Sequence, residues 1–218
     1  MKRSVLVAGP TGLIGGTVLD QLLLDDRFER VIALTRRPLE RSHPRLQHWV
    51  ASGSDLLSAL RADQVDIVHC CLGTTIRAAG SQAAFRHVDH DLVIGLGEWA
   101  KATGATVFCV VSAIGADASS GIFYNRVKGE MERDLKVLGL PALHIFQPSF
   151  LVGPREEVRV GERIGVVAMK LVAPLMIGSL ARYRPMPHDI LARAMINAAE
   201  ISASGTHTYR DIVRLAAD

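Results

Sequence analysis

The stretch Val5-Leu-Val-Ala-Gly9-Pro-Thr-Gly12-Leu-Ile-Gly15-Gly16 decides the fold. Its apolar first half predicts a strand, its glycines predict a sharp turn, and its end predicts the start of a helix. Glycine leaves room where the backbone must turn, approach a ligand and pack a helix against a strand. The free peptide N–H groups of the first helical turn, together with the helix dipole, favour an anion. The stretch therefore predicts a diphosphate-binding turn; a glycine-rich β-turn in another kind of α/β protein is the alternative.

The composition predicts a single domain without a nucleic-acid partner. The chain has 218 residues, of which 49% are hydrophobic and only 5% aromatic. This length is enough for one full hydrophobic core, and small aliphatic side chains suit buried parallel strands and closely packed helices. The net charge of +3 is modest. It gives no argument for nucleic acid and still permits an anionic small molecule.

The cysteines and the first residues predict a cytoplasmic protein. Cys70 and Cys71 are adjacent and Cys109 stands alone, so their spacing matches neither a zinc site nor a secreted disulfide framework. The chain opens with Met1-Lys-Arg-Ser and enters an apolar run that Gly9 ends too early for a signal peptide. We therefore expect a reducing cytosol.

Strand and helix patterns alternate along most of the chain and predict an α/β fold, a Rossmann-type doubly wound parallel sheet, with residues 1–218 as one domain. The expected strands are residues 5–8, 31–34, 46–50, 65–71, 106–111 and 142–146, with 206–210 as an edge strand. The expected helices are residues 17–24, 55–60, 85–103 and 189–201, and a further helix carries Tyr124.

Residues 154–187 interrupt this alternation and predict a small helical substrate or lid region. Residues 155–161 are polar, whereas 164–180 are apolar but interrupted by Lys170 and Pro174. Such a segment is too short and too broken for a membrane span. We expect it to form a helical lid over the substrate or a contact between copies of the chain.

Two arginines follow the second expected strand, where a βαβ unit brings the chain to the ribose of a dinucleotide. An NAD-binding protein has an acidic residue there, which repels a 2′-phosphate, whereas Arg36 and Arg37 after Thr35 bind such a phosphate in a fork. The pattern predicts NADP(H) as cofactor, and a basic surface loop is the alternative.

A second glycine turn, Cys71-Leu72-Gly73-Thr74-Thr75, follows the fourth expected strand. A turn at the carboxyl end of this strand points to the same crevice as the first turn. We expect its backbone to lie against the central phosphates and the nicotinamide ribose, with the threonine hydroxyls available. A plain helix entry without a ligand is the alternative.

Ser112, Tyr124 and Lys128 form the predicted catalytic group. Ser112 ends the fifth expected strand, and Tyr124 and Lys128 share one helix face because they stand at positions i and i+4. Tyrosine has an ordinary pKa of about 10. A nearby lysine ammonium is expected to lower the pKa of Tyr124 and so adapt it to proton exchange at neutral pH. Ser112 adds a hydrogen bond to the substrate oxygen.

No metal site is predicted. His87 and His90 lie three residues apart on an expected helix, which is a spacing that can bind a metal. No matching third ligand accompanies them, so a solvated helix face is the simpler interpretation.

Together these residues resemble the short-chain dehydrogenase/reductase superfamily in its extended or atypical branch, which carries Gly-x-x-Gly-x-x-Gly. The likeness covers nearly the whole chain, and within the branch it is to the Tat-interacting oxidoreductases and their bacterial relatives. The matching blocks are Thr35-Arg36-Arg37, Cys71-Leu72-Gly73-Thr74-Thr75, Gly115-Ala116-Asp117 followed by Ser119-Ser120, and Tyr124 with Val127-Lys128-Gly129-Glu130.

The resemblance implies a role for each motif. Tyr124 would be the acid/base, Lys128 its partner and a ligand of the nicotinamide ribose, and Ser112 the residue that orients the substrate carbonyl. The chain departs from the superfamily at Asp89, where an asparagine often supports a proton-relay water, and at Gln147, where many relatives have arginine. The residues expected to bind the cofactor are Gly9, Thr11, Gly12, Leu13, Ile14, Gly15, Thr35, Arg36, Arg37, Cys71, Leu72, Gly73, Thr74, Tyr124, Lys128 and Pro148.

The sequence therefore predicts an NADP(H)-dependent oxidoreductase that moves a hydride between the nicotinamide and a small carbonyl or alcohol substrate. One alternative is an NADP(H)-binding redox sensor that controls a protein partner. Another is a nucleotide-sugar epimerase or dehydratase, which ranks lower because the residues after Gly153 are few and largely apolar. Homo-oligomer formation is left open.

Overall fold

The computed structural model describes residues 3–153 and 178–217. A seven-stranded sheet is built from β1 (Arg3–Ala8), β2 (Phe28–Thr35), β3 (Leu46–Val50), β4 (Ile67–Cys70), β5 (Val107–Val111), β6 (Ala142–Phe146) and β9 (Gly205–His207). The strand order is β3-β2-β1-β4-β5-β6-β9, and every neighbouring pair is parallel. The chain builds outward from β1 to β3 and then returns to place β4 on the other side of β1. This topology confirms the predicted Rossmann-type sheet.

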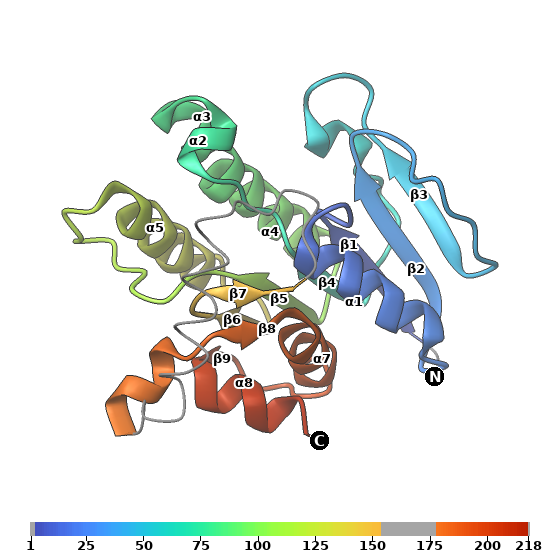
Figure 1. The fold of residues 1–218 in the computed structure, drawn as a ribbon. Coiled ribbons are helices and arrows are strands. Elements are labelled where there is room, and N and C mark those ends of the chain that lie inside the picture. Colours follow the sequence, from blue (N-terminus) through green and yellow to red (C-terminus); the bar gives the residue numbers. More distant parts are fainter. Residues whose placement is uncertain (1–2, 154–177, 218) are drawn as a thin grey trace.

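Helices cover both faces of the sheet (Figure 1). One face carries α1 (Leu13–Leu24), α7 (His188–Ala198) and α8 (Tyr209–Leu215); the other carries the 3₁₀ turn η1 (Leu56–Ala59), α4 (Leu92–Ala102) and α5 (Phe123–Leu138). Neighbouring residues of a strand point to opposite faces. Val7 of β1 therefore packs with the first group of helices and Leu6 with the second, which buries the sheet on both sides.

The helix expected over residues 85–103 begins earlier and contains a π-helical turn. Short α2 (Ile76–Ala79) precedes it, and then α3 (Gln82–Arg86), the π-helical turn η2 (His87–Asp91) and α4 follow one another without a break. A π turn is rare, usually lasts a single turn and often occurs at functional sites. Asp89 lies in this turn and is only 1% exposed.

The predicted substrate or lid region is described only at its ends, because residues 154–177 lie outside the described residues. The chain enters it through β7 (Leu151–Val152) and returns through the 3₁₀ turn η4 (Gly178–Tyr183) and β8 (Met186–Pro187). β7 and β8 pair in parallel, so the two ends of the region lie side by side.

The carboxyl-terminal part differs slightly from the prediction. The edge strand expected at residues 206–210 ends at His207, because the Thr208 N–H and hydroxyl both donate to the Asp211 carboxylate (3.1 Å each) and start α8. None of the described helices is both long enough and apolar enough to cross a membrane.

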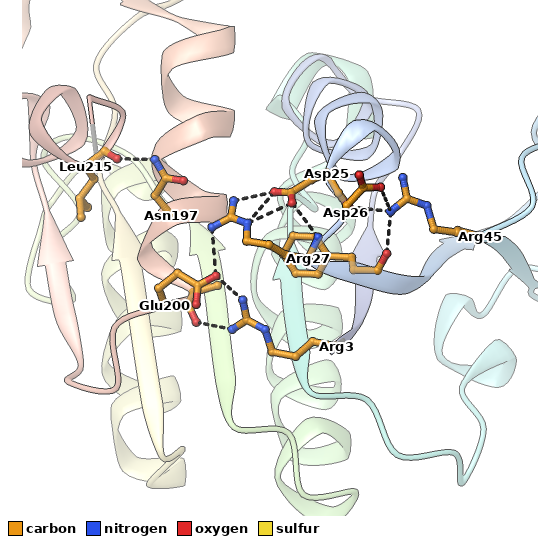
Figure 2. A network of polar contacts seen from close by, with 10 residues as sticks. Arg3, Asp25, Asp26, Arg27, Arg45, Asn197, Glu200 and Leu215 are labelled. Atoms are coloured by element: carbon orange, nitrogen blue, oxygen red, sulfur yellow. Dashed lines mark hydrogen bonds and ion pairs between the residues drawn. The ribbon is translucent and has the colours of Figure 1, made fainter. Parts of the chain in front are cut away.

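Ion pairs join several segments near the amino-terminal end of β1. Figure 2 shows Arg27 between Asp25 and Glu200, with Arg3 on the same Glu200. Arg45 donates to three backbone carbonyls at and just after the end of α1. Carbonyls at a helix carboxyl end have no partner within the helix, so this guanidinium satisfies them and complements the helix dipole.

Two buried histidines and one half-buried histidine lie in the same part of the sheet. His69 of β4 and His144 of β6 flank Cys109 of β5 in register, and His144 Nδ1 lies 3.0 Å from His207 Nε2. Within the described part of the chain, neither ring nitrogen of His69 has a hydrogen-bond partner. Burial lowers the pKa of His69 to about 3 and that of His207 to about 4, and it also lowers the pKa of His144. All three rings are therefore neutral at neutral pH.

We expect these histidines to make the fold sensitive to acid. An unfolded histidine has a pKa of about 6.5, so below that pH the unfolded chain binds protons that the folded chain does not. Stability is therefore fully present above this pH and falls as pH decreases toward the folded values of about 3 and about 4. Over that interval the fully buried His69 lowers the free energy of unfolding by about 1.4 kcal/mol per pH unit.

His69→Leu is the variant that isolates this effect, because it replaces a buried ring that lacks partners with an apolar side chain. Urea unfolding measured over a series of acidic pH values should give a shallower decline of stability for His69→Leu than for the wild type. Identical slopes would contradict the neutral burial of His69.

Candidate functional site

The predicted site residues come from the carboxyl ends of neighbouring strands and from α5. The turns after β1, β2 and β4, Ser112 after β5, and Gln147 and Pro148 after β6 lie at one edge of the sheet because all these strands are parallel. The strand order reverses between β1 and β4. Ligands of open α/β sheets bind in the crevice at such a point. The fold thus gathers motifs that are far apart in sequence.

The two glycine turns touch each other. β1 and β4 are paired as far as Ala8 and Cys70, and the Cys71 N–H donates to the Ala8 carbonyl (2.9 Å). Gly9 has a φ of +80°, and a Cβ on it would lie 2.8 Å from the Cys71 oxygen. A Cβ on Gly15 would lie 2.1 Å from the Gly9 oxygen. A side chain at either position would push the turns or α1 apart, so both positions require glycine.

The first turn of α1 presents backbone to the crevice. α1 begins at Leu13, directly after the turn and earlier than expected, with Gly12 as its N-cap and no acidic residue in its first turn. Thr11 and Gly12 are exposed, Leu13 is half-buried, and the Ile14 side chain lies in the hydrophobic core. The N–H groups of this turn, together with the dipole of α1, are suited to an anion.

Arg36 and Arg37 are exposed directly after β2. The buried Thr35 hydroxyl donates to the Arg37 carbonyl, which fixes the backbone of this loop. Arg30, near the other end of β2, pairs with Asp63 (3.7 Å). Among the described residues neither Arg36 nor Arg37 forms an ion pair, so both guanidinium groups are available to a ligand.

A buried ion pair joins α5 to the second glycine turn. Lys128 Nζ lies 2.8 Å from Asp89 Oδ1, and the two side chains are 4% and 1% exposed. The Thr74 N–H donates to the other carboxylate oxygen (2.8 Å), and a Cβ on Gly73 would lie 3.4 Å from Asp89 Oδ1. One carboxylate therefore holds the predicted catalytic lysine against the loop predicted to contact the cofactor.

The side chains of the other two residues in that turn point away from solvent. Cys71 packs against the core on the α1 face of the sheet, and Leu72 is buried on the α4 face. Only their backbone groups are placed to line the crevice. Thr75 caps α2, because its hydroxyl accepts a hydrogen bond from the Ala78 N–H (3.1 Å).

Tyr124 lies at the start of α5 with its ring against Phe85 of α3, at a centroid distance of 5.4 Å. Burial raises the pKa of Tyr124, the Lys128 ammonium lowers it, and the Asp89 carboxylate raises it again. The net shift of the pKa is upward. Lys128 acts on the pKa in the predicted direction, but the expected net lowering of the Tyr124 pKa is wrong, because burial of the side chain outweighs the ammonium. The sequence pattern contained neither that burial nor the carboxylate beside the lysine.

Ser112 faces a second buried carboxylate. Its hydroxyl donates to Glu132 of α5, and the Gln147 side-chain amide donates to both oxygens of the same carboxylate (2.9 and 3.0 Å). Ser112 and Glu132 are 4% and 5% exposed. Pro148 is buried, and its carbonyl accepts from the Ile114 N–H (2.9 Å), which ties the loops after β5 and β6 together.

Glu132 is a residue that the sequence analysis missed. It lies one turn after Lys128, among the buried Val127, Met131 and Leu135 of α5. A carboxylate at helical spacing within an apolar face is a signal for a buried polar contact. Its partners come from β5 and β6, so only the tertiary structure identifies them.

Metal binding has no support in the described part of the chain, where no group of three or more His, Cys, Asp or Glu side chains is arranged to hold an ion. His87 and His90 instead approach Asp91 (3.8 and 2.8 Å), and His90 also contacts Asp134 (3.0 Å).

Comparison with curated proteins finds relatives along most of the chain. The protein FMP52, mitochondrial, of Eremothecium gossypii is 37% identical over 171 residues, which cover 78% of this chain and 76% of that protein. The protein HTATIP2 of Rattus norvegicus is 34% identical over 208 residues, which cover 94% of this chain and 84% of that protein. No family model matches the chain.

These relatives correct the cytoplasmic prediction. The FMP52 proteins of Eremothecium gossypii, Coccidioides immitis and Emericella nidulans are all named mitochondrial. The sparse cysteines and the apolar first strand fit a reducing interior in general, and they do not distinguish one compartment from another.

Solved structures show the same fold in proteins of distant sequence. UDP-N-acetylglucosamine 4-epimerase from Bacillus cereus superimposes with a TM-score of 0.67 at 18% identity, covering 97% of this chain and 79% of that chain. This likeness shows the fold alone, whereas the higher identity to HTATIP2 and FMP52 extends along the chain. The chain belongs to the family of HTATIP2 and FMP52, in the atypical branch of the short-chain dehydrogenase/reductases.

Proposed function

We propose that the protein is an NADP(H)-dependent oxidoreductase that transfers a hydride between the nicotinamide and a small carbonyl or alcohol substrate. One observation carries the proposal: the Tyr124 and Lys128 face of α5 meets the loop after β4, where Lys128 and the Thr74 N–H share the Asp89 carboxylate. A tyrosine and a lysine are thereby fixed beside a crevice of dinucleotide-binding shape.

The residues of the crevice fit a nicotinamide dinucleotide. The contact of the two glycine turns leaves a cradle that a Cβ at Gly9 or Gly15 would disrupt. The backbone of residues 9–15 would hold the diphosphate, and the backbone of residues 71–74 together with Pro148 would contact the nicotinamide half. When bound, the cofactor supplies or accepts the hydride.

The preference for NADP(H) follows from the loop after β2. Arg36 and Arg37 are exposed at the position where the chain meets the adenosine ribose, and they present guanidinium groups suited to a 2′-phosphate. An acidic side chain that would favour NAD by binding the ribose hydroxyls is absent from residues 35–37.

Three side chains of this chain would handle the proton and orient the substrate. Tyr124 donates a proton to the substrate oxygen during reduction, and Lys128 binds the nicotinamide ribose. The Ser112 hydroxyl hydrogen already points to Glu132. Ser112 is therefore suited to accept a hydrogen bond from a substrate hydroxyl or from Tyr124, instead of donating one to the carbonyl.

The predicted substrate or lid region, residues 154–187, begins and ends beside the crevice. β7 pairs with β8, and a Cβ on Gly153 would lie 2.8 Å from Leu13 Cδ1 in the first turn of α1. Residues 154–177 lie outside the described residues, so the role of the region toward the substrate stays a prediction.

The cofactor preference is tested with Arg36→Ala and Arg37→Ala. Each charge-assisted hydrogen bond to the 2′-phosphate contributes about 1.5–3 kcal/mol, so we expect NADPH affinity to fall roughly 10- to 100-fold while NADH affinity hardly changes. Fluorescence titration with each nucleotide measures both values. Arg30→Ala is the matched control, because Arg30 is an arginine of the same strand already paired with Asp63. Equal losses for NADPH and NADH would contradict a 2′-phosphate clamp.

The catalytic role is tested with Tyr124→Phe, which keeps the ring against Phe85 and removes only the hydroxyl. We expect the rate of NADPH-dependent reduction of aldehydes or ketones to fall about 100-fold or more, with NADPH affinity nearly unchanged. Unchanged turnover would contradict the mechanism. A UDP-sugar is the comparison substrate: its conversion without net oxidation or reduction of the nicotinamide would instead indicate an epimerase.

A further inference from the structure

Asp89 contacts two parts of the site that belong to different elements. Its Oδ1 lies 2.8 Å from Lys128 Nζ of α5, and its Oδ2 accepts from the Thr74 N–H of the turn after β4 (2.8 Å). The carboxylate reaches both from the π-helical turn η2 and is 1% exposed. Oδ2 is thus hydrogen-bonded, whereas Oδ1 meets the ammonium as an ion pair without an aligned hydrogen bond. Asp89 is therefore placed to act on the lysine.

The ion pair weakens the electrostatic effect of Lys128 on neighbouring groups. An ammonium held at 2.8 Å from a buried carboxylate acts on a third group nearly as a dipole, whereas an unpaired ammonium acts as a full charge. Tyr124 is one helical turn from Lys128, its ring packs against Phe85, and the Lys128 and Asp89 charges act on its pKa in opposite directions. The net positive field at its hydroxyl is therefore small.

The other titratable group beside the ion pair is also neutral. Burial raises the pKa of the Cys70 thiol in β4 to about 12, although Lys128 lowers it. The Lys128 ammonium also donates to the uncharged Val111 carbonyl (3.5 Å). Within the described residues, Asp89 is thus the charge that balances the lysine.

We propose that Asp89 is a positioning residue that neutralises Lys128 and keeps Tyr124 protonated, so that oxidation of an alcohol sets in only at a higher pH. This inference rests on the proposed function and adds a pH dependence to it.

The two directions of the reaction need different forms of Tyr124. In the reduction, the carbonyl carbon accepts a hydride from the reduced nicotinamide, and the carbonyl oxygen accepts the Tyr124 proton. The products are an alcohol, the oxidised nicotinamide and a tyrosinate, which takes its proton back from water. In the oxidation, a tyrosinate must first accept the alcohol proton. A protonated Tyr124 is ready only for the reduction.

Asp89→Asn is the decisive variant. Asparagine has nearly the same size and keeps an oxygen that can accept from the Thr74 N–H, but it removes the charge beside Lys128. The unpaired ammonium should then stabilise the tyrosinate and lower the midpoint of Tyr124 ionisation by about one pH unit. At a fixed pH below that midpoint this gives about tenfold more tyrosinate, and the pH midpoint of alcohol oxidation should fall by the same amount.

Tyrosinate absorbance in the ultraviolet measures the ionisation without cofactor or substrate. The chain has 3 tyrosines, so the titration of Tyr124→Phe is subtracted to isolate Tyr124. The matched control is Asp91→Asn, which removes a half-exposed carboxylate from the same turn that faces His90 (2.8 Å). This control should leave the Tyr124 titration unchanged. Circular dichroism at each pH confirms that the variant is folded.

Asp89→Ser provides a second neutral variant if Asp89→Asn fails to fold, and the same downward shift is expected. An unchanged Tyr124 midpoint in the neutral variant overturns the inference. A lowered Tyr124 midpoint with an unchanged pH profile of alcohol oxidation overturns the part of the inference that concerns catalysis. Failure of NADPH to bind would overturn the proposed function instead, because the titration itself requires no cofactor and reports only on the three side chains.

Discussion

The contact between β1 and β4 at their carboxyl ends is the constraint on which the rest of the structure depends. Gly9 and Cys71 meet there, and Gly15 brings α1 so close that a Cβ would lie 2.1 Å from the Gly9 oxygen. This contact fixes the direction of α1, so that its free N–H groups face the crevice. It also fixes the backbone of the turn after β4. The Thr74 N–H of this turn binds the Asp89 carboxylate, which in turn pairs with Lys128.

Two buried carboxylates bind two of the predicted catalytic side chains, those of Lys128 and Ser112. Asp89 on η2 binds Lys128, and Glu132 on α5 accepts from Ser112. Each carboxylate also accepts a second donor, from the Thr74 backbone or the Gln147 amide. A buried charge is costly unless it is paired and hydrogen-bonded, and these contacts satisfy that condition. The same contacts limit the rotamers of the lysine and the serine, which is how a supporting shell preorganises a site.

Two departures from the superfamily pattern lie in these two clusters. Asp89 stands where an asparagine is common and supplies a charge to the lysine. Gln147 stands where arginine is common and offers an amide to Glu132 instead of a second charge. Short-chain dehydrogenase/reductases share one fold across many reactions, so the chemistry of this protein has to be argued from such residues and not from the sheet.

The sequence by itself determined the doubly wound sheet, the glycine turns and the spacing of Tyr124 and Lys128. These features are local: strand and helix periodicity, glycine positions and an i, i+4 pair all act within a few residues. The tertiary structure decided the π turn that brings Asp89 inside, the partner of Glu132, and the direction of the Tyr124 pKa shift. A buried charge interacts with whatever the fold brings near it, and those neighbours come from β4, β5 and β6, far away in the sequence.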